Sequence, residues 1–269
     1  MRVAAVQMTS VDDVAVNLAA ASQWVSQAAD QGAELVVLPE NFAFLRREGM
    51  PIPCAQSLAG EIVEALRAWA SRHRIWIVGG SFHESVPDDP RVHNTSVAIA
   101  PDGAIAAVYR KIHLFDVDLR SQGGQAYRES ERVLAGAEVV SFDTPFGVVG
   151  LSVCYDLRFP ELYRDLATRG ARFLCVPSAF ARETGRDHWE VLLRARAIEN
   201  QCFVLAPAQC GEHPGGRMTY GRSLIVDPWG LVLARAADRP GPVVAECFLE
   251  EQDRIRTSLP VLLHRRLPV

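Results

Sequence analysis

The sequence predicts an α/β fold in which two β-sheets are covered by helices. Short apolar runs typical of buried strands recur along all 269 residues, and several of them alternate with helical patterns. Other runs are joined by tight turns, which indicates antiparallel hairpins and argues against one simple doubly wound sheet. No stretch rich in Pro, Gly or Ser divides the chain and no repeat is present, so we expect one domain over residues 1–269.

The predicted strands are the runs of β-branched, aliphatic and aromatic residues bounded by turn residues. They cover Val3–Gln7, Leu35–Leu38, Ile75–Gly79, Asn94–Ala100, Ala104–Tyr109, Val148–Val153, Phe173–Pro177, Cys202–Ala206, Gly221–Val226, Leu231–Ala234 and Val243–Phe248. The segments 101–103 and 227–230 are predicted to be tight links between antiparallel strands, because Asp, Pro and Gly favour turns.

The predicted helices have apolar residues at steps of three and four. They cover Asp12–Asp30, Gly60–His73, Pro160–Arg169 and Asp187–Asn200. Three polar stretches are predicted to be surface loops near the mouth of a site: Ser85–Arg91, Asp118–Arg128 and Gly211–Arg217.

Composition restricts the class of partner. The net charge of −4 and the pI of about 6.0 provide no basic surface for nucleic acid or for an anionic membrane. No apolar run approaches the ~20 residues of a membrane span, and the N-terminal run is too short for a signal peptide. We therefore expect a soluble, cytoplasmic protein. Its six cysteines form no C-x-x-C pair, which gives no support to a zinc site or to a disulfide framework.

Three chemically versatile residues each follow a predicted buried strand. Glu40 follows the run 34–39, Lys111 follows the run 104–110, and Cys154 lies between a strand and a helix that opens at Pro160. A cysteine in such a turn can lie near backbone amides and the positive end of a helix, which favours the thiolate. Taken singly, a buried thiol is usually structural, a lone glutamate often caps a helix, and a lone lysine is usually solvated.

Taken together, these segments resemble the carbon–nitrogen hydrolase, or nitrilase, superfamily. Its three signature segments are matched in order by Leu38-Pro-Glu40, Tyr109–Phe115 and Val153–Glu161, and the likeness runs from Arg2 to about Arg266. The segments 177–180, 184–185 and 188–199 are similar to the omega-amidase-like branch. A second group of segments most resembles the deaminated glutathione amidases: 208–211, 226–230, 259–260 and 264–266.

The resemblance implies a four-layer α-β-β-α sandwich that pairs into a dimer, with about residues 250–269 as a candidate contributor to the dimer contact. It implies that Cys154 is the nucleophile, that Glu40 is the general base and acid, and that Lys111 with the backbone N–H of Tyr155 binds the oxyanion. Glu129 matches an additional active-site glutamate, although it could instead pair with a neighbouring arginine. Neither a metal nor an organic cofactor is implied.

The implied reaction is thiol-dependent hydrolysis of a linear amide through a thioester. The substrate most favoured by the resemblance is deaminated glutathione, giving 2-oxoglutarate and cysteinylglycine in metabolite repair. Alternatives are an omega-amidase acting on 2-oxoglutaramate, an N-carbamoyl amino acid hydrolase, and an inactive binding or scaffold homologue. Candidate residues for the substrate carboxylates are Arg182, Arg186 and Arg222. Asp156 and Arg158 are expected to support the cysteine turn through buried hydrogen bonds.

Overall fold

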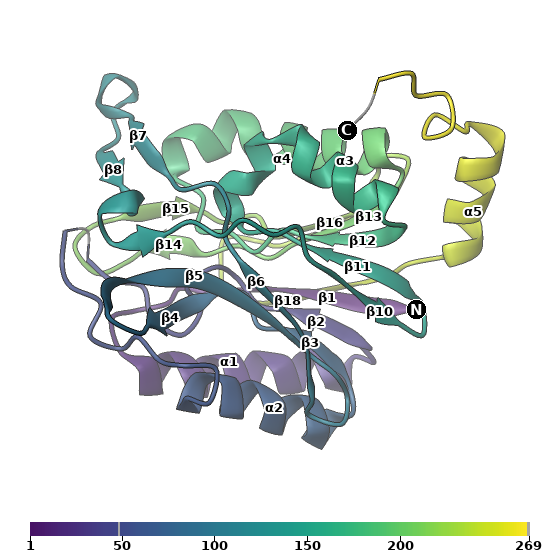
Figure 1. Cartoon of the computed structure of the whole chain (residues 1–269). Helices are drawn as coiled ribbons and strands as arrows, with labels where there is room; N and C mark the ends of the chain where they lie inside the picture. Colours follow the sequence, from purple (N-terminus) through teal and green to yellow (C-terminus); the bar gives the residue numbers. More distant parts are fainter. Residues whose placement is uncertain (48, 268–269) are drawn as a thin grey trace.

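The computed structural model describes residues 1–47 and 49–267. It has two β-sheets packed face to face, with a layer of helices on the outer face of each sheet (Figure 1). This arrangement confirms the predicted α/β class and the four-layer α-β-β-α sandwich. The last two residues of the predicted domain, 268 and 269, lie outside the described residues.

The first sheet has the order β18-β1-β2-β3-β5-β4, with β6 and β9 also pairing with β5. Strands β1, β2 and β3 are parallel, and the remaining pairs are antiparallel except β5 with β9. The strands are β1 (Arg2–Gln7), β2 (Leu35–Val37), β3 (Trp76–Val78), β4 (Phe82–Val86), β5 (Asp89–Ile99), β6 (Ile105–Arg110), β9 (Val133–Leu134) and β18 (Gly241–Glu246). Helices α1 (Val14–Asp30) and α2 (Glu61–His73) cover this sheet (Figure 1).

The second sheet has the order β10-β11-β12-β13-β16-β17, and its central strands β11, β12 and β13 are parallel. The strands are β10 (Ser141–Thr144), β11 (Gly147–Leu151), β12 (Ala171–Cys175), β13 (Phe203–Ala206), β16 (Leu224–Val226) and β17 (Val232–Arg235). Helices α3 (Pro160–Thr168) and α4 (Arg182–Asn200) cover its outer face, whereas α5 (Leu249–Ser258) lies to one side of the sandwich (Figure 1).

Two hairpins and three short 3₁₀ segments complete the fold. The hairpins pair β7 (Asp116–Asp118) with β8 (Ala126–Arg128) and β14 (Cys210–Glu212) with β15 (Met218–Tyr220). The 3₁₀ segments are η1 (Arg120–Gln122), η2 (Glu129–Glu131) and η3 (Cys154–Arg158). The described residues contain no helix that is both long and apolar enough to cross a membrane.

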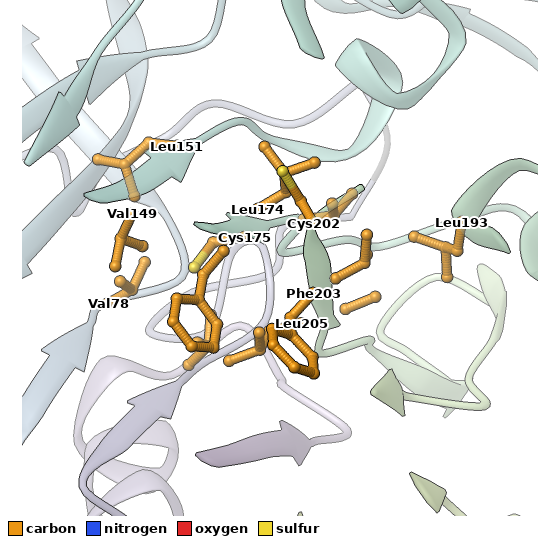
Figure 2. Close-up of a cluster of buried hydrophobic side chains, with 14 of the residues drawn as sticks. Val78, Val149, Leu151, Leu174, Cys175, Leu193, Cys202, Phe203 and Leu205 are labelled. Atoms are coloured by element: carbon orange, nitrogen blue, oxygen red, sulfur yellow. The ribbon is translucent and has the colours of Figure 1, made fainter. Parts of the chain in front are cut away.

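The alternation of side chains along β1 explains how one short strand serves two hydrophobic cores. Val3 and Ala5 point into the core that includes the space between the sheets, whereas Ala4 and Val6 point toward α1 and α2. All four side chains are fully buried, so the central run of the strand, Val3 to Val6, is apolar on both faces. Figure 2 shows part of the larger core, in which strands β11, β12 and β13 contribute Val149, Leu151, Leu174, Cys175, Phe203 and Leu205.

Several predicted boundaries need correction. The segment Ser85–Arg91, predicted to be a loop, includes the ends of β4 and β5, and Asp118–Arg128 includes a strand of the β7–β8 hairpin. Helix α4 starts at Arg182, five residues before the predicted start. Gly185 made the helix seem to begin later, but this glycine serves packing, because a Cβ there would lie 2.4 Å from the Tyr220 Cβ. Helix α5 was not predicted. Both predicted antiparallel links, 101–103 and 227–230, are confirmed.

Candidate active site

Glu40, Lys111, Glu129 and Cys154 come from four separate places in the chain and line one cavity. Glu40 follows β2, Lys111 follows β6, Glu129 begins η2 after β8, and Cys154 follows β11. The cavity has an empty volume of about 700 Å³ with its open mouth included. The sequence-predicted residues that carry acid, base and nucleophile chemistry therefore lie together.

Glu40 is a buried carboxylate, 3% exposed, that is surrounded by donors. Its Oε1 accepts from Lys111 Nζ at 3.0 Å and from Asn94 Nδ2 at 2.9 Å, and its Oε2 accepts from the Ala179 N–H at 2.9 Å. The Cys154 thiol is also hydrogen-bonded to it. Burial by itself would raise the pKa of Glu40, but the Lys111 charge and these hydrogen bonds outweigh burial and lower it. Glu40 is therefore ionised and in contact with the thiol proton.

Lys111 lies between two carboxylates. Its Nζ is 3.0 Å from Glu40 Oε1 and 2.9 Å from Glu129 Oε2, and the side chain is 2% exposed. Burial lowers the pKa of Lys111, but the charges of Glu129 and Glu40 more than compensate and raise it above its usual value. Glu129 is itself fixed, because its Oε2 accepts from the Phe115 N–H at 2.7 Å. Lys111 is consequently a permanent buried cation in the wall of the cavity.

Cys154 occupies a strained turn, with a φ of 49° in the left-handed region that a residue other than glycine seldom adopts. Its backbone N–H donates to the Pro177 carbonyl at 2.8 Å, which holds the turn against the loop that follows β12. Burial and the nearby Glu40 charge raise the pKa of the thiol. The expectation of a favoured thiolate was therefore wrong for the resting site, because η3 is a single short turn and the adjacent carboxylate repels a second negative charge.

Asp156 connects the cysteine turn to the lysine strand and confirms its predicted structural role. This carboxylate is fully buried. Its Oδ2 accepts from the Tyr109 hydroxyl at 2.6 Å and the Val153 N–H at 2.8 Å. Its Oδ1 lies 3.0 Å from the His113 N and 2.7 Å from His113 Nδ1. Tyr109 and His113 are each two residues from Lys111, so one carboxylate fixes the relative positions of Cys154 and Lys111.

A close backbone approach positions the loop that carries Glu40. Gly80 has a φ of 50°, and a Cβ at this position would lie 2.0 Å from the Pro39 carbonyl oxygen. Only glycine fits this approach, which allows the Ser81 Oγ to accept from the Asn41 N–H at 3.0 Å. The peptide after Glu40 is thereby held against the end of β3.

Several cavity residues were not proposed as site residues from the sequence, although some of them lie in the family-matching segments or in the loops predicted near the mouth of the site. They include two arginines, a buried histidine and three aromatic residues: Arg46, Arg217, His83, Phe115, Tyr127 and Phe180. Asn94 was also missed, although its Nδ2 bridges Glu40 and Glu129 at 2.9 and 3.2 Å. The available signal for Asn94 was an amide in an apolar strand, since such a group needs buried partners.

The arginines proposed from the sequence do not line the cavity. Arg182 is the first residue of α4 and is exposed. Arg186 pairs with the adjacent Asp187, and Arg222 pairs with Asp238 at 2.8 Å. Tyr155 does line the cavity, directly after Cys154. Across residues 1–47 and 49–267, no group of three or more His, Cys, Asp or Glu side chains is placed to hold a metal ion.

Comparison with known proteins agrees with this geometry. The carbon-nitrogen hydrolase family pattern matches residues 2–256. The chain is 46% identical over 265 residues to a deaminated glutathione amidase of Synechocystis, covering 97% of each chain. Its fold matches the crystal structure of the Caenorhabditis elegans NitFhit protein with a TM-score of 0.91 and 43% identity, covering 98% of this chain and 65% of the other.

A further structural relative bears on the cysteine. The amidase from Nesterenkonia sp. AN1 is 28% identical, with a TM-score of 0.79 over 97% of this chain and 98% of that chain. Its structure shows the result of Michael addition of acrylamide at the active site cysteine. The family match over nearly the full chain and the high identity to its relatives lead to one conclusion: this chain belongs to the carbon–nitrogen hydrolase family and is a hydrolase that acts on amide carbon–nitrogen bonds.

Proposed function

We propose that this enzyme hydrolyses deaminated glutathione to 2-oxoglutarate and cysteinylglycine. The observation that carries the proposal is the contact of a buried thiol with an ionised carboxylate beside a buried cation, in a cavity with two further arginines. The name of the Synechocystis relative supports this substrate. A substrate with two carboxylates also suits the cavity, because its described lining includes the basic side chains of Lys111, Arg46 and Arg217 beside the acidic side chains of Glu40 and Glu129.

In the proposed acylation step, Glu40 removes the thiol proton as the sulfur of Cys154 attacks the amide carbonyl carbon. The negative charge that develops on the carbonyl oxygen is stabilised by Lys111 Nζ and by the backbone N–H of Tyr155. Protonated Glu40 then returns the proton to the amide nitrogen as the carbon–nitrogen bond breaks. The products of this step are the free amine and a thioester on Cys154.

In the proposed deacylation step, water attacks the thioester carbonyl and Glu40 accepts its proton. The same oxyanion donors act again, and collapse of the intermediate returns the proton to the sulfur. Glu129 acts by fixing the Lys111 ammonium, because it provides two hydrogen-bond acceptors at 2.9 and 3.1 Å from Nζ. This mechanism uses only side chains and one peptide N–H of the protein.

We further propose that the enzyme is a cytoplasmic homodimer that acts in metabolite repair. Exposed apolar side chains on α4 and on the β16–β17 link support association of two copies: Val191, Ile198, Trp229 and Leu231 are between 50% and 67% exposed. Analytical ultracentrifugation of the native protein would test the dimer.

The test of the proposed activity compares release of 2-oxoglutarate from deaminated glutathione and from 2-oxoglutaramate. Native protein, Cys154→Ala and the matched control Cys54→Ala should be assayed together, since Cys54 does not line the cavity. We expect a higher kcat/KM on deaminated glutathione, lost in Cys154→Ala and kept in the control. A preference for 2-oxoglutaramate would make the enzyme an omega-amidase. Absence of turnover on both substrates would contradict the proposal.

A further inference from the structure

Arg217 is held at a fixed place on the edge of the cavity. It directly precedes β15, and its carbonyl accepts from the His213 N–H at 2.8 Å. The His213 ring is also anchored, because Nδ1 lies 2.8 Å from the Ser10 carbonyl oxygen and Nε2 lies 2.7 Å from the Thr219 Oγ1. His213 is only 3% exposed. The β14–β15 hairpin therefore presents Arg217 from a rigid base rather than from a free loop tip.

The guanidinium of Arg217 is held in place but has no anionic partner among residues 1–47 and 49–267. Its Cζ lies 5.4 Å from the centroid of the Tyr127 ring, and its Nη2 donates to the Ala179 carbonyl at 3.3 Å. Its Nε is buried and has no hydrogen-bond partner. Within the described residues Arg217 forms no ion pair, although it lines the cavity. A partly buried guanidinium with an unused N–H is suited to bind a planar carboxylate through two parallel hydrogen bonds.

Among the described residues, the carboxylates that line the cavity do not fill this role. Glu40 and Glu129 both pair with Lys111 and accept from Asn94. Arg217 is therefore available to an anion that a ligand brings into the cavity. Among the described residues, Arg217 is the only arginine whose guanidinium donates to the Ala179 carbonyl. A ligand bound to Arg217 would therefore lie beside this carbonyl.

The Ala179 peptide also identifies the part of the substrate that Arg217 faces. The carbonyl of Ala179 accepts from Arg217. The N–H of the same residue donates to Glu40 Oε2 at 2.9 Å. In the proposed mechanism Glu40 delivers a proton to the departing nitrogen, so the leaving amine must lie on the Glu40 side of Cys154. The positive charge of Arg217 acts on Glu40 and contributes to lowering its pKa. Arg217 is therefore on the leaving-group side of the cavity.

We infer that Arg217 binds the carboxylate of the leaving amine, which for deaminated glutathione is the terminal carboxylate of cysteinylglycine; this inference rests on the function proposed above. Arg217 thereby distinguishes amides whose leaving group ends in a carboxylate from amides that release ammonia. The catalytic groups act on both kinds of substrate. Arg217 sets the preference between them.

The test uses Arg217→Met, which keeps an apolar chain against Tyr127 and removes the charge, and Arg217→Lys, which keeps the charge without the planar fork. Arg254→Met is the matched control, because Arg254 is 74% exposed on α5 and pairs with Glu251. Each protein is assayed on deaminated glutathione, on its terminal carboxamide and on 2-oxoglutaramate. The thermal midpoint of each variant is measured in parallel.

In Arg217→Met, we expect kcat/KM on deaminated glutathione to fall about 10- to 100-fold, mainly through a higher KM, since a hydrogen-bonded charge pair is lost. The kcat/KM on 2-oxoglutaramate should change less than about threefold, and Arg217→Lys should recover part of the loss. The native enzyme should have a kcat/KM about 10- to 100-fold lower on the terminal carboxamide than on deaminated glutathione. Arg217→Met should have similar kcat/KM values on these two substrates.

Two results would overturn the inference. One is an equal loss on deaminated glutathione and 2-oxoglutaramate, which would place Arg217 on the acyl side or assign it to folding. The other is Arg217→Met that still prefers the carboxylate to the carboxamide. Failure of the proposed function itself would look different, because it would appear in the native enzyme, either as turnover of neither substrate or as a preference for 2-oxoglutaramate.

Discussion

Replacing Asp156 by asparagine should destabilise the protein and reduce its activity, although the side chain touches neither Cys154 nor Lys111. The carboxylate is fully buried and has four close donor positions around its two oxygens. Asparagine keeps one oxygen and presents an amide donor in place of the other. In either orientation, the backbone N–H of Val153 or of His113 then faces a second donor.

The magnitude follows from this count. A buried backbone N–H without a partner costs about 1–3 kcal/mol, and the remaining bonds pass from a charged to a neutral acceptor with a further loss of about 1 kcal/mol. We therefore expect Asp156→Asn to lower the free energy of unfolding by about 3 kcal/mol. For a chain of this size, such a loss corresponds to a fall of roughly 6–12 °C in the thermal midpoint.

Urea unfolding and kcat/KM should be measured for Asp156→Asn and for the control Asp165→Asn. Asp165 lies on α3 with a partly exposed side chain that pairs with Arg169, so its replacement should cost less than about 1 kcal/mol. The kcat/KM of Asp156→Asn should fall because the cysteine turn and the lysine strand lose their shared anchor. A variant with less than about 1 kcal/mol of destabilisation and unchanged kcat/KM would refute the reasoning.

Three further predictions concern charge. Glu129→Gln should lower kcat/KM about 10- to 100-fold because Lys111 loses one of its two carboxylates. Glu131 is exposed, so the control Glu131→Gln should keep the native kcat/KM in the same steady-state assay. Ionised Glu40 has a lowered pKa, so a pH profile of kcat/KM should retain activity down to below pH 4.5; an acid midpoint above 5 would contradict this. Burial lowers the pKa of His213 to about 4, against an ordinary 6.5, so the unfolded state binds the extra proton and stability should fall as the pH falls through 6.5. The free energy of unfolding should be measured by urea at pH 7 and at pH 5. The loss of stability between these pH values should be about 2 kcal/mol smaller in His213→Gln than in the native protein.

Local sequence patterns were sufficient to predict most of the buried strands and the helices that cover them. Full burial of Val3 through Val6 follows from a run that is apolar at every position, and the helical steps of Val25 and Ala28 place both in the core. Helix α5 was missed because only Gln252 and Ile255 are buried on it, so it has no apolar stripe to detect. Its position depends on contacts such as the Gln252 side chain with the Gln201 carbonyl, which are distant in sequence.

The site was predictable only where chemistry coincided with the end of a strand. Glu40, Lys111 and Cys154 each follow an apolar run, which drew attention to them. Arg217 follows a Gly215-Gly216 pair that allows a hairpin turn, and nothing in that local pattern separates it from Arg182 or Arg222. The distinction is whether an acid lies nearby in space: Arg222 has Asp238, whereas Arg217 has none among the described residues.

The protonation state of Cys154 shows why local pattern and site chemistry can disagree. A turn at the start of a helix favours a thiolate, but the ammonium of Lys111 is already paired with Glu40 and Glu129. Ionising the thiol would place a third negative charge around the ammonium of Lys111, where burial weakens the screening of charges. A neutral thiol beside an ionised carboxylate avoids that repulsion. Proton removal is then coupled to attack on the substrate, because the charge moves onto an oxygen that Lys111 can stabilise.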